Sequence, residues 1–129
     1  MKKVIVTGGS GFIGSNLVKL LLKKKYFVIN IDSLKYSANP YNTKNLNKNK
    51  NYVFFKLDLN NKSQIIKILK KYKPYGIFNL AAETHVDRSI DNPFSFIHSN
   101  ILGTYNLLES MLAYKKRIKL VHISTDEVY

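Results

Sequence analysis

The sequence "TGGSGFIG", Thr7–Gly14, links an apolar strand to an amphipathic helix, and the architecture of the chain follows from it. Gly8, Gly11 and Gly14 fit the pattern G-x-x-G-x-x-G, while Gly9 with the last two fits G-x-G-x-x-G. In such loops one glycine turns the chain, one lets backbone approach a pyrophosphate, and one lets the helix pack on the sheet. The helix N-terminus offers free N–H groups to phosphates. A strand before and a helix after predict a dinucleotide-binding loop rather than a simple tight turn.

Beyond this loop, apolar strands alternate with segments of helical periodicity. The expected strands are Lys3–Thr7, Tyr26–Ile31, Tyr52–Leu57, Tyr75–Ala81 and Ile118–Ser124. The expected helices are Gly11–Lys24, Asn61–Tyr72 and Asn92–Tyr114. Strands that alternate with helices of a dozen residues predict an α/β fold, a doubly wound, Rossmann-like parallel sheet with apolar strands covered on both faces. Residues 1–129 are expected to be one domain, cut off after its fifth strand.

Two local features carry further expectations. Leu17, Leu20 and Leu21 share one face of the first helix, which predicts that they face the sheet. The segment Ser33–Asn51 is rich in Asn and Lys and contains Pro40, so it is expected to be a surface loop.

The composition narrows the class of protein. The chain has 129 residues, 45% of them hydrophobic, and no cysteine, so we expect a globular domain without disulfides or thiolate chemistry. Its first apolar run is too short for a signal peptide or membrane span, which predicts a cytoplasmic protein with no membrane partner. The net charge of +13 comes from 19 Lys and 2 Arg spread along the chain, a pattern of solvated surface rather than of a nucleic-acid groove. We therefore expect no nucleic-acid partner, although the positive field would attract a phosphorylated substrate.

Asp32 lies at the end of the second expected strand, in the position from which a carboxylate accepts hydrogen bonds from an adenosine ribose. A carboxylate there repels a 2′-phosphate, and no Arg follows it, Lys35 being the nearest cation. The sequence thus favours NAD over NADP, with a simple turn or capping role for Asp32 as the alternative. Asp58 follows the third expected strand. By itself it would be a turn residue, but its position also allows it to reach the adenine of a dinucleotide.

Several blocks together resemble a known family. They are "VTGGSGFIGSN", "NIDSLKYSAN", "NLAAETHVDRSIDNP", "NILGTYNLLE" and "HISTDEVY". With them the chain resembles the extended short-chain dehydrogenase/reductases, and within these the dTDP-glucose 4,6-dehydratases. The resemblance runs from Lys3 to Tyr129, and the Thr-Asp-Glu triplet is its most selective part, since epimerases of the superfamily usually carry Ser-Ser or Thr-Ser there.

The resemblance implies a set of NAD-binding residues, with Thr84 also touching the sugar. This set is Gly8, Gly11, Phe12, Ile13, Gly14, Asp32, Ser33, Leu34, Lys35, Asp58, Leu59, Leu80, Ala81, Ala82, Thr84 and Ser99. Thr84 and Ser99 replace the family's usual Ser and Thr, and each exchange keeps a hydroxyl. The long helix is implied to form part of a homodimer interface in the full-length protein.

The resemblance also implies a reaction on a sugar nucleotide, with dTDP-glucose as the expected substrate. A hydride leaves C4 of the hexose for NAD⁺, water is lost across C5 and C6, and the hydride returns to C6, giving a 4-keto-6-deoxy sugar. Loss of water needs one ionised and one protonated carboxyl, which neighbouring acids provide when their environments separate their pKa values. By family correspondence Asp126 is the acid, Glu127 the base, and Thr125 binds the sugar hydroxyl near C4. No metal is expected, because His85 has no partners at ligand spacing.

One element of the family is absent from the chain. Its members use a Tyr-x-x-x-Lys motif, in which the lysine lowers the pKa of the tyrosine that takes the O4 proton. Tyr52–Lys56 has this spacing numerically, but we reject it as the motif because it lies in an expected strand whose side chains alternate between faces. We therefore expect the N-terminal part of a longer enzyme, without its substrate domain and without turnover of its own.

The sequence leaves alternatives open. A UDP-sugar 4,6-dehydratase, a 4-epimerase or a decarboxylase of the same superfamily would share most motifs, and Asp126-Glu127 argues for dehydration. A non-catalytic NAD-binding module would bind NAD without any effect of a sugar nucleotide. A nucleic-acid binder would show binding that falls steeply with salt.

Overall fold

The computed structural model describes residues 1–34, 40–81, 94 and 101–123. Its core is a 5-stranded parallel sheet in the order β3-β2-β1-β4-β5, which confirms the predicted α/β Rossmann-like class. The strands are β1 Lys3–Thr7, β2 Phe27–Asp32, β3 Tyr52–Lys56, β4 Gly76–Asn79 and β5 Lys119–His122. The helices are α1 Phe12–Lys23, the 3-10 helix η1 Pro40–Lys48, α2 Lys62–Tyr72 and α5 Gly103–Tyr114. No helix of this described part is both long and apolar enough to cross a membrane.

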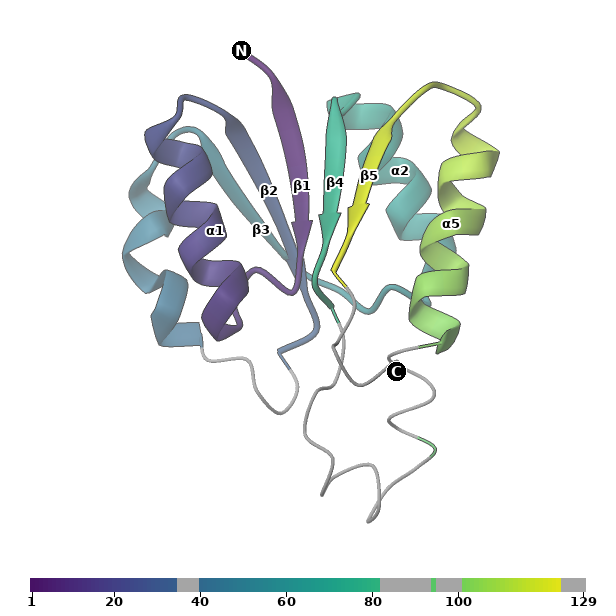
Figure 1. Ribbon diagram of the computed structural model, residues 1–129, viewed down its shortest axis with the longest axis horizontal. Coiled ribbons are helices and arrows are strands. Elements are labelled where there is room, and N and C mark those ends of the chain that lie inside the picture. The colour runs from purple at the N-terminus through teal and green to yellow at the C-terminus, as the bar shows by residue number, and fades with distance from the viewer. Residues whose placement is uncertain (35–39, 82–93, 95–100, 124–129) are drawn as a thin grey trace.

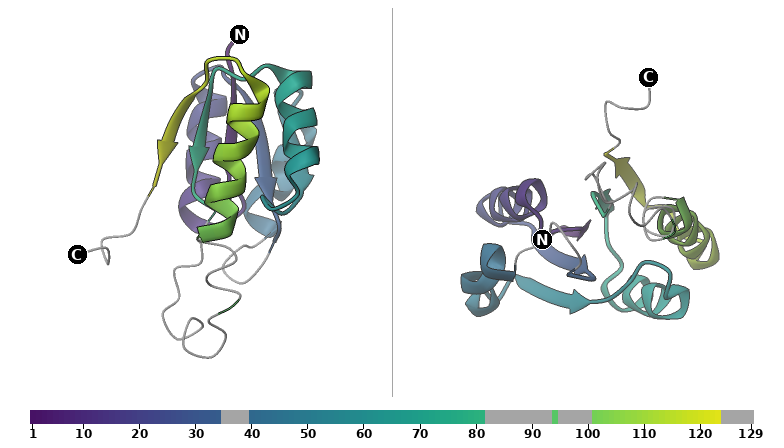
Figure 2. Two further views of the ribbon diagram at one scale, coloured as in Figure 1. Left: turned by 90° about the vertical axis from the view of Figure 1, so that its right-hand side faces the viewer. Right: turned by 90° about the horizontal axis from the view of Figure 1, so that it is seen from below.

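The helices cover the sheet on both faces (Figures 1 and 2). On one face, Val4 and Val6 of β1 pack with Val18 and Leu21 of α1. On the other face, alternate strand residues pack against α2 and α5. This second cluster consists of Ile5, Ile29, Ile31, Leu59, Ile65, Ile68, Leu69, Ile77, Leu107 and Tyr114. The period-2 alternation of the strands therefore supplies two cores, as a doubly covered sheet requires.

The first helix differs from its expected orientation. Leu21 is buried, but Leu20 is 47% exposed, and Val18 instead lies in the core with 0% exposure. Gly14 and Ser15 are also buried, so the inward face is rotated toward the small residues that follow the glycine loop. The close approach that Gly14 permits sets this rotation, and a leucine count alone does not reveal it.

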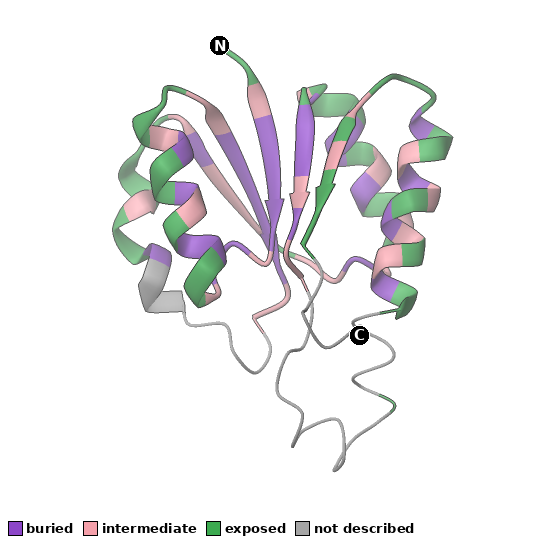
Figure 3. Ribbon diagram, viewed as in Figure 1, coloured by how far each residue is buried: buried purple, intermediate pink, exposed green. Residues whose placement is uncertain are grey.

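Two further segments differ from expectation. The segment around Pro40 forms η1 rather than an irregular loop, since proline at the first position of a helix lacks only an N–H that would be unpaired anyway. β5 lies at the sheet edge and is mostly exposed instead of being covered on both faces (Figure 3). Val121 in this strand is 46% exposed, and Ile123 directly after it is 44% exposed. Within the described residues, no helix covers the α1 side of the sheet at this strand.

Candidate functional site

The glycine loop lies at the carboxyl end of the strands, where ligands bind in open parallel sheets (Figure 1). Gly8 has a φ of +73°, a left-handed conformation that favours glycine. Its N–H donates to the carbonyl of Ile31 at 2.8 Å. A Cβ on Gly8 would lie 2.8 Å from both the carbonyl carbon and oxygen of Leu80. The turn after β1 is therefore closed directly against the chain that leaves β4.

Gly14 and Gly11 have different surroundings. A Cβ on Gly14 would lie 2.1 Å from the carbonyl oxygen of Gly8, so this glycine lets α1 rest on the loop. A Cβ on Gly11 would meet only that same oxygen, at 3.4 Å, an ordinary contact. Gly11 thus has free space beside it, which is what backbone needs if a ligand is to approach closely.

The N-terminus of α1 is suited to an anion. Gly11 is the N-cap and provides no side-chain cap, and the first turn holds no acidic residue. The first N–H groups of any α-helix lack partners within the helix and carry a partial positive charge. Phe12 and Ile13 stand at this end with 79% and 66% of their surface exposed. Nothing in the helix itself satisfies these N–H groups, so a phosphate is a fitting partner.

Asp32 is held in a defined position beside the loop. Its side chain is buried, with Oδ2 accepting the N–H of Ser10 at 3.0 Å and Oδ1 accepting the N–H of Leu34 at 2.8 Å. Burial raises the pKa of Asp32, while the N–H groups of Leu34 and Ser10 act in the opposite direction. Each carboxylate oxygen has a second lone pair, so this carboxyl can still accept hydroxyl donors. The carboxyl therefore fixes the loop and keeps lone pairs for a further donor.

Asp58 follows β3 next to this position, since the N–H of Leu57 donates to the carbonyl of Asp32 at 3.1 Å. Its Oδ1 accepts from the backbone and side-chain nitrogens of Asn60 at 2.9 and 3.0 Å, the arrangement of a turn. The side chain of Leu59 is 6% exposed and belongs to the core, so it is not available to a ligand.

A buried hydrogen-bond network joins β1 to β4, and sequence analysis did not identify it. The hydroxyl of Thr7 donates to Oδ1 of Asn79 at 2.5 Å. It accepts the N–H groups of Leu80 and Ala81 at 3.1 and 3.2 Å. The amide of Asn79 continues to Nδ1 of His122 at 3.1 Å, so the network extends to β5. The network fixes the chain where Leu80 and Ala81 were predicted to line the cofactor.

A second buried polar side chain, that of Asn30, is hydrogen-bonded to the glycine loop. Asn30 in the apolar strand β2 has 0% exposure and donates to Oγ of Ser10 at 3.2 Å and to the hydroxyl of Tyr52 at 3.0 Å. Its Oδ1 has no hydrogen-bond partner and lies where a Cβ on Gly9 would come within 2.3 Å. Asparagine inside otherwise apolar strands, at positions 30 and 79, was the available signal for both networks.

The structure brings the described cofactor candidates together at the carboxyl ends of the strands. These are Gly8, Gly11, Phe12, Ile13, Gly14, Asp32, Ser33, Leu34, Asp58, Leu59, Leu80 and Ala81. The remaining candidates, Lys35, Ala82, Thr84, Ser99, Thr125, Asp126 and Glu127, lie outside the described residues. Within the described part of the chain, no group of three His, Asp or Glu side chains is arranged to hold a metal.

Comparisons with known proteins agree with this geometry. A family profile described as "GDP-mannose 4,6 dehydratase" matches residues 5–129. The dTDP-glucose 4,6-dehydratase of Haemophilus influenzae is 45% identical over 138 aligned residues, which cover 100% of this chain and 41% of that protein. The solved dTDP-glucose 4,6-dehydratase of Bacillus anthracis in complex with NAD matches with a TM-score of 0.86 at 38% identity, over 99% of this chain and 39% of that one.

A second kind of sugar-nucleotide enzyme shares the fold. The UDP-glucose 4-epimerase of Thermotoga maritima, solved with UDP-glucose, matches with a TM-score of 0.83 at 32% identity, over 95% of this chain and 38% of that one. The chain spans about two fifths of the length of the curated relatives it matches.

Proposed function

Because this chain belongs to the sugar-nucleotide 4,6-dehydratase family of NAD-dependent epimerases and dehydratases, we propose that it is the N-terminal, NAD-binding part of a dTDP-glucose 4,6-dehydratase. The observation that carries the proposal is the glycine loop tied to a buried carboxyl: Ser10 in the loop donates to Asp32 at the end of β2. This one contact joins a phosphate-binding turn to a ribose-binding acid. The coverage of about two fifths of each relative supports a longer parent protein.

The described residues fit NAD. The first turn of α1 would take the pyrophosphate, Gly11 would let it approach, and Asp32 would accept the ribose hydroxyls. The buried carboxylate would repel a 2′-phosphate, which favours NAD over NADP. Bound NAD would supply an acceptor and donor of hydride for the hexose. This chain would hold that cofactor next to the carboxyl ends of β4 and β5.

The dehydration chemistry is assigned to the residues that follow β5. Ile123 donates its N–H to the carbonyl of Asn79 at 3.1 Å, so β5 stays paired with β4 up to the last described residue. Thr125 comes two positions later, with Asp126 and Glu127 after it. Thr125 would bind the sugar hydroxyl near C4, Asp126 would protonate the departing C6 hydroxyl, and Glu127 would remove the C5 proton. Thr84, outside the described residues, would also contact the sugar.

The parent enzyme is proposed to be a homodimer. Ile101, Tyr105, Leu108 and Leu112 recur at helical spacing along α5 and its start, and they are 61%, 57%, 42% and 71% exposed. An apolar stripe of this kind on a solvent-facing helix is typical of a helix–helix interface.

Cofactor binding is tested on the 129-residue chain by isothermal titration calorimetry with NAD⁺ and NADP⁺. We expect measurable binding of NAD⁺ and weaker binding of NADP⁺. Asp32→Asn should weaken NAD⁺ binding and reduce the preference, whereas Glu109→Gln on α5, which removes one remote acid, should change neither. Equal binding of both cofactors by the parent sequence would contradict the assignment of Asp32.

Catalysis is tested on the protein encoded by the complete gene, with dTDP-glucose as substrate and mass spectrometry as the readout. A product lighter by one water is expected, and Glu127→Gln should abolish it while leaving NAD⁺ binding intact. A product of unchanged mass whose inverted C4 is detected by proton NMR would identify the 4-epimerase alternative instead. The same assay with UDP-glucose separates the two possible nucleotides, and the 129-residue chain alone should give no turnover.

A further inference from the structure

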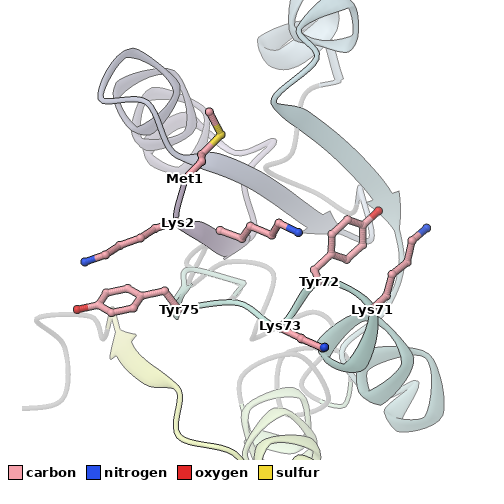
Figure 4. A pocket seen from close by; sticks show the side chains of 7 residues that line it. Met1, Lys2, Lys71, Tyr72, Lys73 and Tyr75 are labelled. Carbon is pink, nitrogen blue, oxygen red and sulfur yellow. The ribbon is translucent and has the colours of Figure 1, made fainter.

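A basic pocket lies at the opposite end of the strands from the glycine loop. It is an open surface hollow with a volume of about 550 Å³. It is lined by Met1, Lys2, Lys3, Lys71, Tyr72, Lys73 and Tyr75, and we call it the amino-edge pocket. Figure 4 shows the labelled side chains coming from the start of β1, the end of α2 and the turn that leads into β4.

Backbone hydrogen bonds hold the segments of this pocket together. Phe27 donates its N–H to the carbonyl of Lys2 at 2.9 Å, and Tyr75 donates to the carbonyl of Lys3 at 2.7 Å. Lys73 is the left-handed C-cap of α2, with its N–H bonded to the carbonyl of Leu69 at 2.9 Å. The four lysines are therefore carried by two anchored segments, the start of β1 and the end of α2, rather than by one loose loop.

The positive charge of the pocket is not balanced by neighbouring acids. Among the residues that the structure describes, no carboxylate lies within 4.0 Å of these lysines, and the described ion pair of Glu109 is with Lys62. Asp32, the last residue of β2, and Asp58, after β3, lie at the opposite, carboxyl ends of the strands. The negative end of the α2 dipole interacts favourably with Lys71, which lies in its last turn, but Lys2 and Lys3 belong to β1 and its approach. An anion in the pocket would relieve this repulsion among like charges.

The aromatic rings of the pocket are already in contact with other groups. The ammonium groups of Lys2 and Lys119 lie 4.1 and 5.0 Å from the ring centroid of Tyr75, and Lys119 also donates to its hydroxyl at 2.8 Å. Tyr72 stacks on Phe27 with centroids 5.9 Å apart. Single-stranded nucleic acid needs open aromatic faces on which bases stack, and this pocket offers ammonium groups instead.

From these observations we propose that the amino-edge pocket binds a compact polyphosphate group, such as a diphosphate, at a site separate from the dinucleotide site. Several lysines on a fixed frame suit an anion with two or more negative charges, because each ammonium contributes a modest attraction that adds to the others. The diphosphate can be free or can be the end of a nucleotide, since the charges recognise the same group in both. The proposal is independent of the proposed dehydratase function.

The test is a titration of the ¹⁵N-labelled 129-residue chain with inorganic pyrophosphate, followed by NMR at each backbone amide. Saturable shifts are expected at Lys2, Lys73, Tyr75 and Gly76. Shifts at the glycine loop report the dinucleotide site separately, and they should disappear when NAD is present in excess. A parallel titration with ADP distinguishes the sources: equal affinity means that the diphosphate alone is recognised, and tighter binding of ADP means that a nucleoside adds contacts.

The variant Lys2→Gln/Lys71→Gln should weaken pyrophosphate binding at the amino edge by about fivefold. The control Lys19→Gln/Lys23→Gln removes the same charge from exposed positions of α1, with Lys23 matching Lys71 in the last turn of a helix, and should change affinity less than about twofold. The proposal is overturned if the amino-edge amides do not shift saturably, or if both variants weaken binding equally. It is also overturned if an oligonucleotide binds there more tightly than pyrophosphate and loses affinity steeply with salt.

Discussion

Replacing Gly14 with alanine tests how α1 is seated on the loop. The added Cβ would lie 2.1 Å from the carbonyl oxygen of Gly8 and 2.9 Å from both the carbonyl carbon of Gly8 and the Cα of Gly9. All three are backbone atoms, so α1 must move away from the loop, carrying Val18 and Leu21 partly out of the core. Overpacking of this kind costs about 1–3 kcal/mol and occasionally more. Alanine is the better helix former by about 1 kcal/mol, which offsets part of this.

We therefore expect Gly14→Ala to lower the free energy of unfolding by about 1–2 kcal/mol, a substantial share of the total for a single domain. Urea denaturation followed by circular dichroism measures the change. Gly11→Ala is the matched control, because its Cβ has only one contact, at 3.4 Å, and its φ is −75°. It should keep stability within about 1 kcal/mol and still weaken NAD⁺ binding. Loss of less than 1 kcal/mol in Gly14→Ala, or an equal loss in both variants, would refute this account of the loop.

Three other changes address the carboxyl, the hydroxyl network and the helix stripe. Burial raises the pKa of Asp32 above its ordinary 3.8, so the folded state holds this proton more tightly than the unfolded state. The contribution of Asp32 to stability is therefore lost as pH rises through its folded pKa, and urea titrations at several pH values should show this loss removed in Asp32→Asn. Thr7→Val removes a hydroxyl that accepts two N–H groups, and should lower the free energy of unfolding by about 1–3 kcal/mol in the same assay. Leu112→Glu should shift the full-length protein from dimer to monomer in sedimentation velocity without lowering its melting temperature.

Each of these changes has a control. A pH profile of Asp32→Asn that parallels the parent chain would show that this carboxyl ionises alike in both states. Thr7→Ser keeps the hydroxyl and removes only the methyl group, so it should retain most of the stability. An equal loss in Thr7→Ser and Thr7→Val would contradict a specific contribution of the hydroxyl. Leu20→Glu places the same charge on an exposed position of α1 and should leave the dimer intact. Dissociation by both glutamate variants would point to a general charge effect.

The local sequence pattern was sufficient to predict the parallel sheet and the glycine loop. Lys3–Thr7 was predicted and found as β1, because four of its five residues are buried and the glycines end the strand abruptly. Leu20 was placed wrongly, since helix rotation depends on the close approach at Gly14, which periodicity does not encode. The 3-10 helix that begins at Pro40 was missed because its composition of Asn and Lys is typical of a loop.

The buried hydrogen-bond networks could not be predicted from the sequence for a different reason. The bond between Thr7 and Asn79 joins residues 72 positions apart, and no local pattern predicts which distant strand a buried hydroxyl will face. Asp32 was identified from its spacing to the glycines, but its two backbone donors appear only in the folded structure. The assigned roles of Thr125, Asp126 and Glu127 depend on family resemblance and remain predictions.

The link between Thr7 and Asn79 has a consequence for the order of events during synthesis. Thr7, at the start of the glycine loop, is synthesised 72 residues before Asn79, the β4 residue that accepts its hydrogen bond. Closing such a long segment requires the intervening chain to give up its conformational freedom first. The nascent chain should therefore be unable to bind the proposed cofactor tightly until β4 has docked beside β1. We expect added NAD to stabilise the domain only after this step and not to direct the folding of its first half.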